Sequence, residues 1–439
     1  METVLLFSYI AILLLAALLS TRLMKVLKLP NVTGYILTGI IMGPFLFGVF
    51  FNNFTYEGIK SGAVYQIVDK IGWVSTVALG FIAFSIGTSF KKSTLQSVGK
   101  RVVVITILEA LGASILVLVA LLIAHFIAPE HISIELVLTL AAIASATAPA
   151  ATLMVIKQYK ARGPLVNTLL PVVALDDAAA LILFAILFQI ATGIAAGGEL
   201  SFYKMIVKPI IEILISLGIG AVIGLLISFL NRFFHSRNNK LVLCVFSVFA
   251  SVGLYYLFKQ NYMGGFELSS LLMCMIAGAL FTNLCKDSNR TLDILDRFTS
   301  PIYMMFFVIS GASLDLTVFF DGKGGIVVLI AAIYLIFRVV GKYAGAFTGT
   351  SITKCEPQVR KYLGLTLVPQ AGVAIGLATT ANKLFSLYPE TQEASTLILA
   401  VILTSTLIYE LIGPLVSKYA LTKAGEIEVE KPVVEAKKN

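Results

Sequence analysis

Two adjacent aspartates, Asp176 and Asp177, lie in the apolar segment PVVALDDAAALILFAI (residues 171–186). An ionised carboxylate costs about 2.5–3.5 kcal/mol at the centre of a bilayer on an insertion scale. Acids in such segments bind ions, carry protons or pair with a base on another helix. Because neighbouring residues of a helix point about 100° apart, the two carboxylates cannot face one target equally. We therefore expect one to face a cation site and the other a basic partner.

The composition places this segment in a membrane. The chain has 439 residues, of which 58% are hydrophobic and 13% charged, and its mean hydropathy is +0.94. A soluble protein of this length needs a more polar surface, whereas apolar stretches of about 20 residues recur here from end to end. The fold class is therefore predicted to be an all-α polytopic membrane protein. Thirteen spans are expected, near residues 4–24, 30–51, 71–90, 102–127, 134–156, 163–192, 205–231, 241–258, 262–284, 298–318, 325–350, 362–382 and 392–417.

The positive charges indicate how these spans are oriented. Most of the 33 Lys and Arg residues fall in alternate loops, and the positive-inside rule assigns such loops to the cytoplasm. This places the amino terminus outside the cell membrane and the carboxyl terminus in the cytoplasm. The net charge of +9 then reflects orientation and does not indicate nucleic-acid binding. Residues 1–418 are expected to form the transmembrane domain and 419–439 a short charged cytoplasmic tail.

Two pairs of similar segments indicate an internal repeat. FIAFSIGTSF (81–90) is similar to FFVISGASLD (306–315), and SATAPAATL (145–153) is similar to LVPQAGVAI (367–375). The paired segments lie seven spans apart, so the two copies face opposite ways across the membrane. Spans 1–6 and 8–13 are thus predicted to be inverted repeats, an arrangement typical of secondary transporters.

Pro149 and Pro369 occupy matching positions in the two repeats, in the middle of a span. Proline removes a backbone donor and frees a carbonyl group, so each helix is expected to break near mid-membrane rather than only to kink. Polar residues surround both prolines: Ser145 and Thr147 precede the first, and Gln370 follows the second. Broken helix ends of this kind offer carbonyl groups to cations. We expect the two breaks to cross and the hydroxyls of Ser145 and Thr147 to contribute to a cation site.

A basic partner for the aspartates is available in the eleventh span. Arg338 lies close to the middle of residues 325–350, and Lys342 lies one turn nearer the cytoplasm. An aspartate–arginine pair offsets part of the desolvation cost of each group. Glu109, in the fourth span, is expected either to be a second partner of Arg338 or to line a cytoplasmic funnel. The other acids of the spans are expected nearer their ends: Glu212, Glu267, Asp315 and Glu410.

The order of several motifs resembles that of the monovalent cation/proton antiporter superfamily. The motifs are LPNVTGYILTGIIMGP (29–44), ALDDAAAL (174–181), FFVISGASLDL (306–316) and LVPQAGVAIGLA (367–378). The adjacent aspartates are similar to the Asp-Asp motif of its bacterial sodium/proton antiporter branch. This resemblance covers about residues 5 to 418. It implies a homodimer of thirteen-span protomers, each with a dimerisation part and a mobile core that holds two crossed, broken helices.

The resemblance also implies roles for single residues. Asp177 matches the aspartate that binds sodium and exchanges it for protons, and Asp176 matches the one that pairs with a basic residue in the eleventh span. The Lys/Arg-x-x-Gly pattern of that position fits RVVG (338–341), so Arg338 is the expected partner and Lys342 the alternative. Many related antiporters have lysine there. Because a guanidinium keeps its proton, arginine puts in doubt any scheme in which this residue carries a transported proton.

These observations predict a secondary active antiporter that exchanges sodium or lithium for protons by alternating access. A potassium/proton antiporter or potassium efflux system is the alternative, and a channel or membrane sensor on the same fold is less favoured. The sequence has no phosphate-binding loop, nucleophile triad or metal-ligand cluster among its three histidines, so neither an enzyme nor a cofactor is expected. The expected partners are sodium, protons, the lipid bilayer and a second copy of the chain. Stoichiometry is left open.

Overall fold

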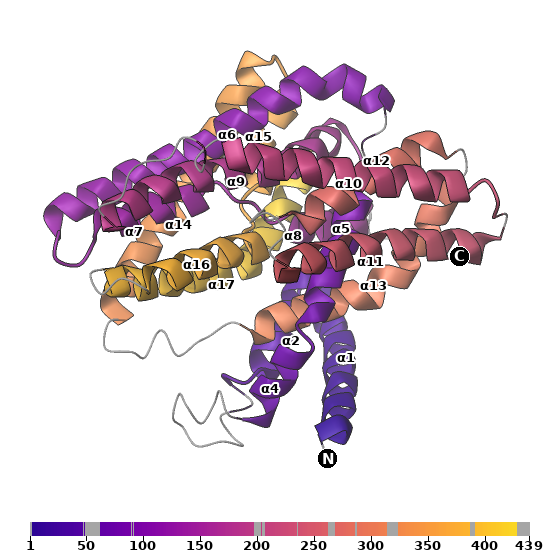
Figure 1. Cartoon of the computed structure of the whole chain (residues 1–439), viewed down its shortest axis with the longest axis horizontal. Coiled ribbons are helices and arrows are strands. Elements are labelled where there is room, and N and C mark those ends of the chain that lie inside the picture. The colour runs from indigo at the N-terminus through magenta and orange to yellow at the C-terminus, as the bar shows by residue number, and fades with distance from the viewer. Residues whose placement is uncertain are drawn as a thin grey trace, which may run out of the picture.

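The computed structural model of this chain describes residues 2–46, 48, 62–88, 90, 92–196, 203, 207–234, 236–261, 268–285, 288–313, 324–386 and 391–427. Within these ranges the chain forms helices and turns and no strand, which confirms the predicted all-α class (Figure 1). The helices are α1 (Glu2–Val26), α2 (Asn31–Met42), α4 (Ala63–Lys70), α5 (Trp73–Gly87), α6 (Lys92–Ile127), α7 (Ile134–Ile143), α8 (Pro149–Tyr159), α9 (Pro164–Ala196), α10 (Lys208–Leu230), α11 (Arg237–Asn261), α12 (Ser270–Leu284), α13 (Ser288–Ala312), α14 (Gly324–Ile352), α15 (Pro357–Thr366), α16 (Gly372–Phe385) and α17 (Gln392–Lys423).

Several of these helices can cross a membrane. Among the described residues, eight helical stretches are long and apolar enough to do so, including the continuous stretch Ala63–Gly87 that joins α4 to α5. The helices α2, α7 and α12 are shorter but also apolar. With α4 and α5, α7 and α8, and α15 and α16 each taken as one span, the described helices correspond to the thirteen expected spans.

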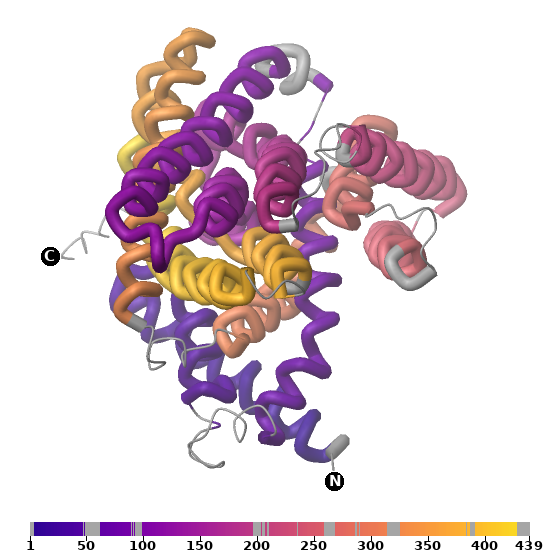
Figure 2. Tube along the Cα trace, turned by 60° about the vertical axis from the view of Figure 1, so that its left-hand side comes forward, coloured from indigo at the N-terminus to yellow at the C-terminus, as the bar shows by residue number. Residues whose placement is uncertain are grey.

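The helices pack as two groups. The core unit, as we call it, comprises α6–α9 and α14–α17, and the scaffold unit comprises α1, α2, α4, α5 and α10–α13. In Figure 2 the pink and salmon helices α10, α11 and α12 of the scaffold unit lie to the right of the purple α6 and the orange α14 of the core unit. The two units meet where α9 touches α5 and α10, where α8 touches α5, and where α2 touches α8 and α17. These helices form the boundary between the two units.

Glycines set the closest contact within the core unit, between α6 and α14. A Cβ atom at Gly341 would lie 2.4 Å from the carbonyl oxygen of Gly112, and one at Gly345 would lie 2.2 Å from that of Leu108. Small residues four apart let membrane helices approach backbone to backbone. This approach brings Glu109, which lies beside these contacts on α6, close to α14.

The two predicted helix breaks are present and cross each other. The first separates α7, which ends at Ile143, from α8, which begins at Pro149. Proline is well suited to the first position of a helix, where its missing N–H group has no intrahelical partner to lose. The second break runs from residue 367 to 371, between α15 and α16. The backbone amide of Ala148 donates to the carbonyl oxygen of Pro369 at 2.9 Å, which joins the two crossing segments.

The end of the chain differs from the expected tail. The helix α17 continues to Lys423, beyond the expected boundary at residue 419. The chain then turns at Gly425, which has a φ of 76°. The Glu426 carboxylate accepts hydrogen bonds from the backbone amides of Leu165 (2.5 Å) and Val166 (2.9 Å) in the first turn of α9. A carboxylate stabilises the positive end of a helix, so this residue is docked on the aspartate-bearing helix. Residues 428–439 lie outside the described part.

The glycine contact between α6 and α14 predicts a stability effect. Gly341→Ala places a methyl group against the Gly112 carbonyl oxygen, so the two helices must separate, and we expect a lower melting temperature in detergent. Gly218 on α10 has open space around it. Gly218→Ala is the matched control and should keep or raise the melting temperature, because alanine favours a helix by up to about 1 kcal/mol over glycine. Equal melting temperatures of the two variants would contradict this packing.

Candidate ion-binding site

Arg338 holds the carbonyl ends of both broken helices. Its Nε donates to the carbonyl oxygen of Ala144 at 3.0 Å, its Nη2 to that of Ala146 at 2.6 Å, and its Nη1 to that of Val368 at 2.7 Å. The last carbonyl groups of a helix have no intrahelical partner, and these three follow the ends of α7 and α15. The guanidinium also lies 4.6 Å from the ring centre of Tyr409. Arg338 therefore satisfies the freed carbonyls and the negative helix ends together.

Lys342 lies one turn further along α14 and contacts two acids. Its ammonium donates to the Ser145 carbonyl oxygen, to Thr147 Oγ1 at 2.7 Å and to Asp176 Oδ2 at 3.0 Å. Glu109 Oε2 is also within ion-pair distance, 2.7 Å from Lys342 Nζ. The side chains of Lys342, Glu109 and Asp176 are 0% exposed. Since an ammonium has three N–H donors, the hydrogen bonds use all of them and the Glu109 contact is electrostatic.

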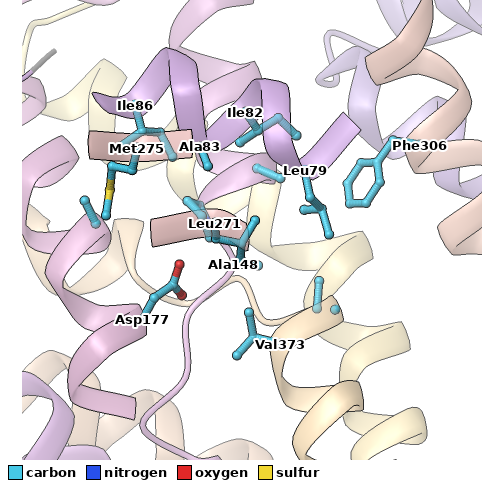
Figure 3. A pocket seen from close by; sticks show the side chains of 15 residues that line it. Leu79, Ile82, Ala83, Ile86, Ala148, Asp177, Leu271, Met275, Phe306 and Val373 are labelled. Carbon is cyan, nitrogen blue, oxygen red and sulfur yellow. The ribbon is translucent and has the colours of Figure 1, made fainter. Parts of the chain in front are cut away.

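Asp177 points away from this cluster, into a cavity at the crossing (Figure 3). Its Oδ1 accepts no hydrogen bond from a described residue, and no described Lys or Arg forms an ion pair with it. The rest of the cavity wall is almost entirely apolar and comprises Leu79, Ile82, Ala83, Ile86, Ala148, Pro149, Ala150, Ala174, Leu271, Met275, Phe306, Ala371, Gly372 and Val373. Asp177 is thus a buried carboxylate next to a space, without a counter-ion from the described residues.

The helix ends give the crossing opposite electrostatic faces. The first residues of α8 and α16, among them Pro149 and Gly372, line the cavity that Asp177 faces. The beginning of a helix carries a partial positive charge, which favours a nearby carboxylate. The partial negative ends of α7 and α15 lie instead against Arg338. This arrangement can hold Asp177 in either charge state, so it can bind a proton or a small cation.

Comparison with known proteins identifies the family. Residues 10–418 match the sequence model of the family described as "Sodium/hydrogen exchanger, transmembrane". This chain belongs to the sodium/hydrogen exchanger family. Its fold is similar to that of the sodium proton antiporter MjNhaP1 from Methanocaldococcus jannaschii at pH 8, with a TM-score of 0.64 and 18% sequence identity over 97% of this chain and 99% of that chain. No curated protein matches the sequence.

Membership confirms the antiporter resemblance seen in the sequence. It supports cation/proton antiport by a multi-pass membrane protein, in a family of transporters rather than enzymes. Family membership does not assign roles to single residues of the site. Those roles are inferred from the geometry of the site.

The structure corrects the expected partner of Asp176. Arg338 is the expected partner, but its three hydrogen bonds go to backbone carbonyls, and Lys342, the alternative, pairs with Asp176. Both basic residues lie on one face of α14 because they are four residues apart, so the sequence pattern fits either. Neither expected role of Glu109 is found, since it pairs with Lys342 and is too deeply buried to line a funnel.

Of the other predicted residues, Pro149 lines the cavity, whereas Ser145, Thr147 and Gln370 lie around the breaks and not on the cavity wall. Ser145 and Thr147 contact Lys342, so their role as ion ligands stays a prediction. The Gln370 side chain donates to the carbonyl oxygen of Ile143 at 3.0 Å and accepts a hydrogen bond from the Tyr334 hydroxyl at 3.1 Å. Tyr334 was not singled out in the sequence. Its spacing is the available signal, because it lies one turn before Arg338 on the same face of α14.

The Lys342 cluster predicts a rescue of stability. Lys342→Met leaves two buried carboxylates without a counter-charge, and breaking a buried pair typically costs about 3–5 kcal/mol. We therefore expect a marked fall in melting temperature, and a partial recovery when Glu109→Gln and Asp176→Asn are added. Lys100→Met, at an exposed position of α6, is the control and should melt like the wild type.

The variant Arg338→Met distinguishes the role of Arg338 from that of Lys342. It should also lower the melting temperature, but the two acid substitutions should not restore it, because the partners of Arg338 are backbone carbonyls. If the acid substitutions rescue Arg338→Met and not Lys342→Met, the assignment of the two residues is reversed.

Proposed function

We propose that this protein exchanges sodium, or lithium, for protons by alternating access, with Asp177 as the carboxylate that holds the cation and the proton in turn. One observation carries the proposal: of the two adjacent aspartates, Asp176 is neutralised by Lys342, whereas Asp177 faces a cavity without a described counter-ion. Adjacent helical residues point about 100° apart, and this separation gives one acid a structural partner and the other a free site.

The apolar wall around Asp177 accounts for coupling between the two ions. An ionised carboxylate without a counter-charge is costly in a site with few polar groups. Binding of a proton or of a sodium ion removes that cost, so the loaded site can move across the barrier and the empty site cannot. Both ions compete for the same carboxylate. Exchange of one for the other follows from this competition, without a continuous pore.

The division into two units supports an alternating-access motion. The cavity is bounded by α8, α9 and α16 of the core unit and by α5, α12 and α13 of the scaffold unit. At one end of α8, Lys157 bridges this boundary, since its ammonium contacts Ser85 Oγ at 2.8 Å and Asp296 Oδ1 at 2.6 Å. We propose that the core unit slides along the scaffold unit and carries Asp177 from one side of the membrane to the other.

Orientation and assembly are proposed on separate grounds. The distribution of Lys and Arg supports an amino terminus outside the cell membrane and a carboxyl terminus in the cytoplasm. The family resemblance supports a homodimer, in which the scaffold units of two copies stay fixed while the core units move. The mass of the protein in detergent, measured by light scattering with the detergent subtracted, tests the homodimer.

Asp177→Asn tests the central assignment. The amide is neutral and cannot exchange protons, so this variant should insert and melt like a folded protein but show no sodium-driven proton flux in vesicles. Asp293→Asn, at an exposed position of α13, is the control and should keep the wild-type flux. A scan with sodium, lithium and potassium as the driving ion distinguishes the proposed specificity from potassium/proton exchange. Retained flux in Asp177→Asn would exclude this residue as the exchange site.

Voltage dependence tests how many protons are exchanged. Glu109 lies 2.7 Å from the Lys342 ammonium, so it can stay paired with Lys342 when Asp176 takes up a proton. We therefore propose that a second proton moves with each sodium ion and that exchange is electrogenic. One net charge couples to the membrane potential by about 2.3 kcal/mol per 100 mV.

Sodium-driven proton flux should then change when valinomycin sets a potassium-diffusion potential across the vesicle membrane. Glu109→Gln, which removes the second acid near Lys342, should reduce this sensitivity. A wild-type flux that is indifferent to the imposed potential would leave Asp177 as the single proton carrier and Asp176 as a fixed partner of Lys342.

A further inference from the structure

Glu410 is a buried acid that lies outside the site described above. It was expected near the end of a span, but it lies within the 32-residue helix α17 and is 2% exposed. The next residue on its amino-terminal side, Tyr409, packs against Arg338 at the crossing, so Glu410 lies at a similar depth in the fold. Acids at such positions are costly to keep unless they have a function.

The surroundings of Glu410 provide hydrogen-bonding groups but no positive charge. The Ser310 hydroxyl on α13 donates to Glu410 Oε1 at 2.7 Å. Glu410 Oε2 accepts no hydrogen bond from any described residue, and the buried Thr406 hydroxyl, one turn earlier on α17, is also without a described partner. Residues four apart share a helix face. Glu410 Oε2 and the Thr406 hydroxyl, both without a described partner, thus lie on one face of α17, and Glu410 reaches from this face to the Ser310 hydroxyl on α13.

No described basic side chain is within ion-pair distance of Glu410. Arg338 is bonded to carbonyls, Lys342 to two acids, and Lys157 to Asp296. The other ionisable residues of α17, of the helices packed around it and of α13 can be listed by helix: Tyr35 on α2, Glu135 on α7, Lys157 and Tyr159 on α8, Arg290, Asp293, Asp296, Arg297 and Tyr303 on α13, Tyr334, Arg338, Lys342 and Tyr343 on α14, Arg360, Lys361 and Tyr362 on α15, Lys383 on α16, and Glu393, Tyr409, Lys418, Tyr419 and Lys423 on α17.

A carboxyl group in these surroundings is far less costly as the neutral acid. An isolated ionised carboxylate in a low-dielectric interior takes up a proton rather than bear its desolvation cost. The Ser310 hydroxyl can donate to the carbonyl oxygen of the neutral acid as well as to a carboxylate, so the observed hydrogen bond fits the protonated form. The surroundings of Glu410 therefore favour the protonated form while Ser310 donates to it.

The hydrogen bond between Ser310 and Glu410 also joins the two units. Ser310 belongs to the scaffold unit, and Glu410 belongs to the core unit. Ser310 is itself part-exposed, so the region beside it is less deeply buried than Glu410. Any sliding of the core unit must separate this pair and change the surroundings of the acid.

We propose that Glu410 is a second proton-binding site, distinct from Asp176 and Asp177, that keeps its proton while it is hydrogen-bonded to Ser310 and gives it to water when the core unit moves. The release step rests on the proposed alternating access, whereas the bound proton does not. Ionisation of Glu410 opposes its return to Ser310, because the charged group would have to be buried without a counter-ion. Turnover then falls at alkaline pH through this acid.

Infrared difference spectroscopy tests the bound proton without transport. The wild-type protein in detergent at neutral pH should show the C=O stretch of a protonated carboxyl that Glu410→Gln lacks. Ser310→Ala should shift this band, because it removes the hydrogen bond to the carbonyl oxygen. Asp177→Asn is the control in which the band should remain. If Glu410→Gln removes only ionised-carboxylate intensity, the proposal is overturned. This spectroscopic result does not depend on whether any variant shows sodium-driven flux.

The pH profile of flux in vesicles tests the consequence for turnover. Glu410→Gln mimics the neutral acid, so it should match the wild type at acidic pH and lose the decline at alkaline pH. Ser310→Ala, the milder change, should keep the decline and move its midpoint. Identical profiles of the wild type and Glu410→Gln would overturn the proposed role. Complete loss of flux in a Glu410→Gln variant that melts normally would also overturn it, by placing this acid in the exchange site itself.

Discussion

Arg338 bonds three carbonyl oxygens that the two helix breaks set free inside the membrane. No water is available in a bilayer core, and each unsatisfied backbone group costs several kcal/mol there. A guanidinium meets this need with several donors and a charge that does not titrate. The two helix breaks can therefore persist at the crossing, and the segments need not form continuous helices. The close packing of α6 and α14 through Gly112 and Gly341 keeps the helix that carries this residue in place.

The same arrangement gives each of the two basic residues, and each of the two aspartates, a different role. Because Arg338 is committed to the backbone, Lys342 is left to neutralise Asp176, and its ammonium can also reach Glu109. The beginnings of α8 and α16 then face Asp177, which lies beside the cavity without a described counter-ion. Lys342 thus pairs with Asp176, and Arg338, which keeps its charge, binds the carbonyl groups of the breaks. The proposed exchange at Asp177 can therefore change its charge without breaking the bonds that hold the crossing.

Much of this could be predicted from the sequence, because the membrane restricts what a polar residue can do. Pro149 and Pro369 indicated the two breaks, and the adjacent aspartates indicated the site. The choice between Arg338 and Lys342 could not be made, since both lie on one face of α14 and only the depth of Asp176 on α9 decides between them. The depth of Glu410 was also misjudged, because α17 is longer than the span expected there. Such relative heights depend on how neighbouring helices pack, which one sequence does not show.

The central claim is that sodium and protons compete for the carboxylate of Asp177. Isothermal calorimetry of sodium binding to the purified protein at a series of pH values tests it most directly. The account predicts that the apparent dissociation constant rises as the pH falls, by about tenfold per pH unit for each proton displaced, with protons released into the buffer on binding. A dissociation constant that stays the same at every pH, with no proton release, would contradict it.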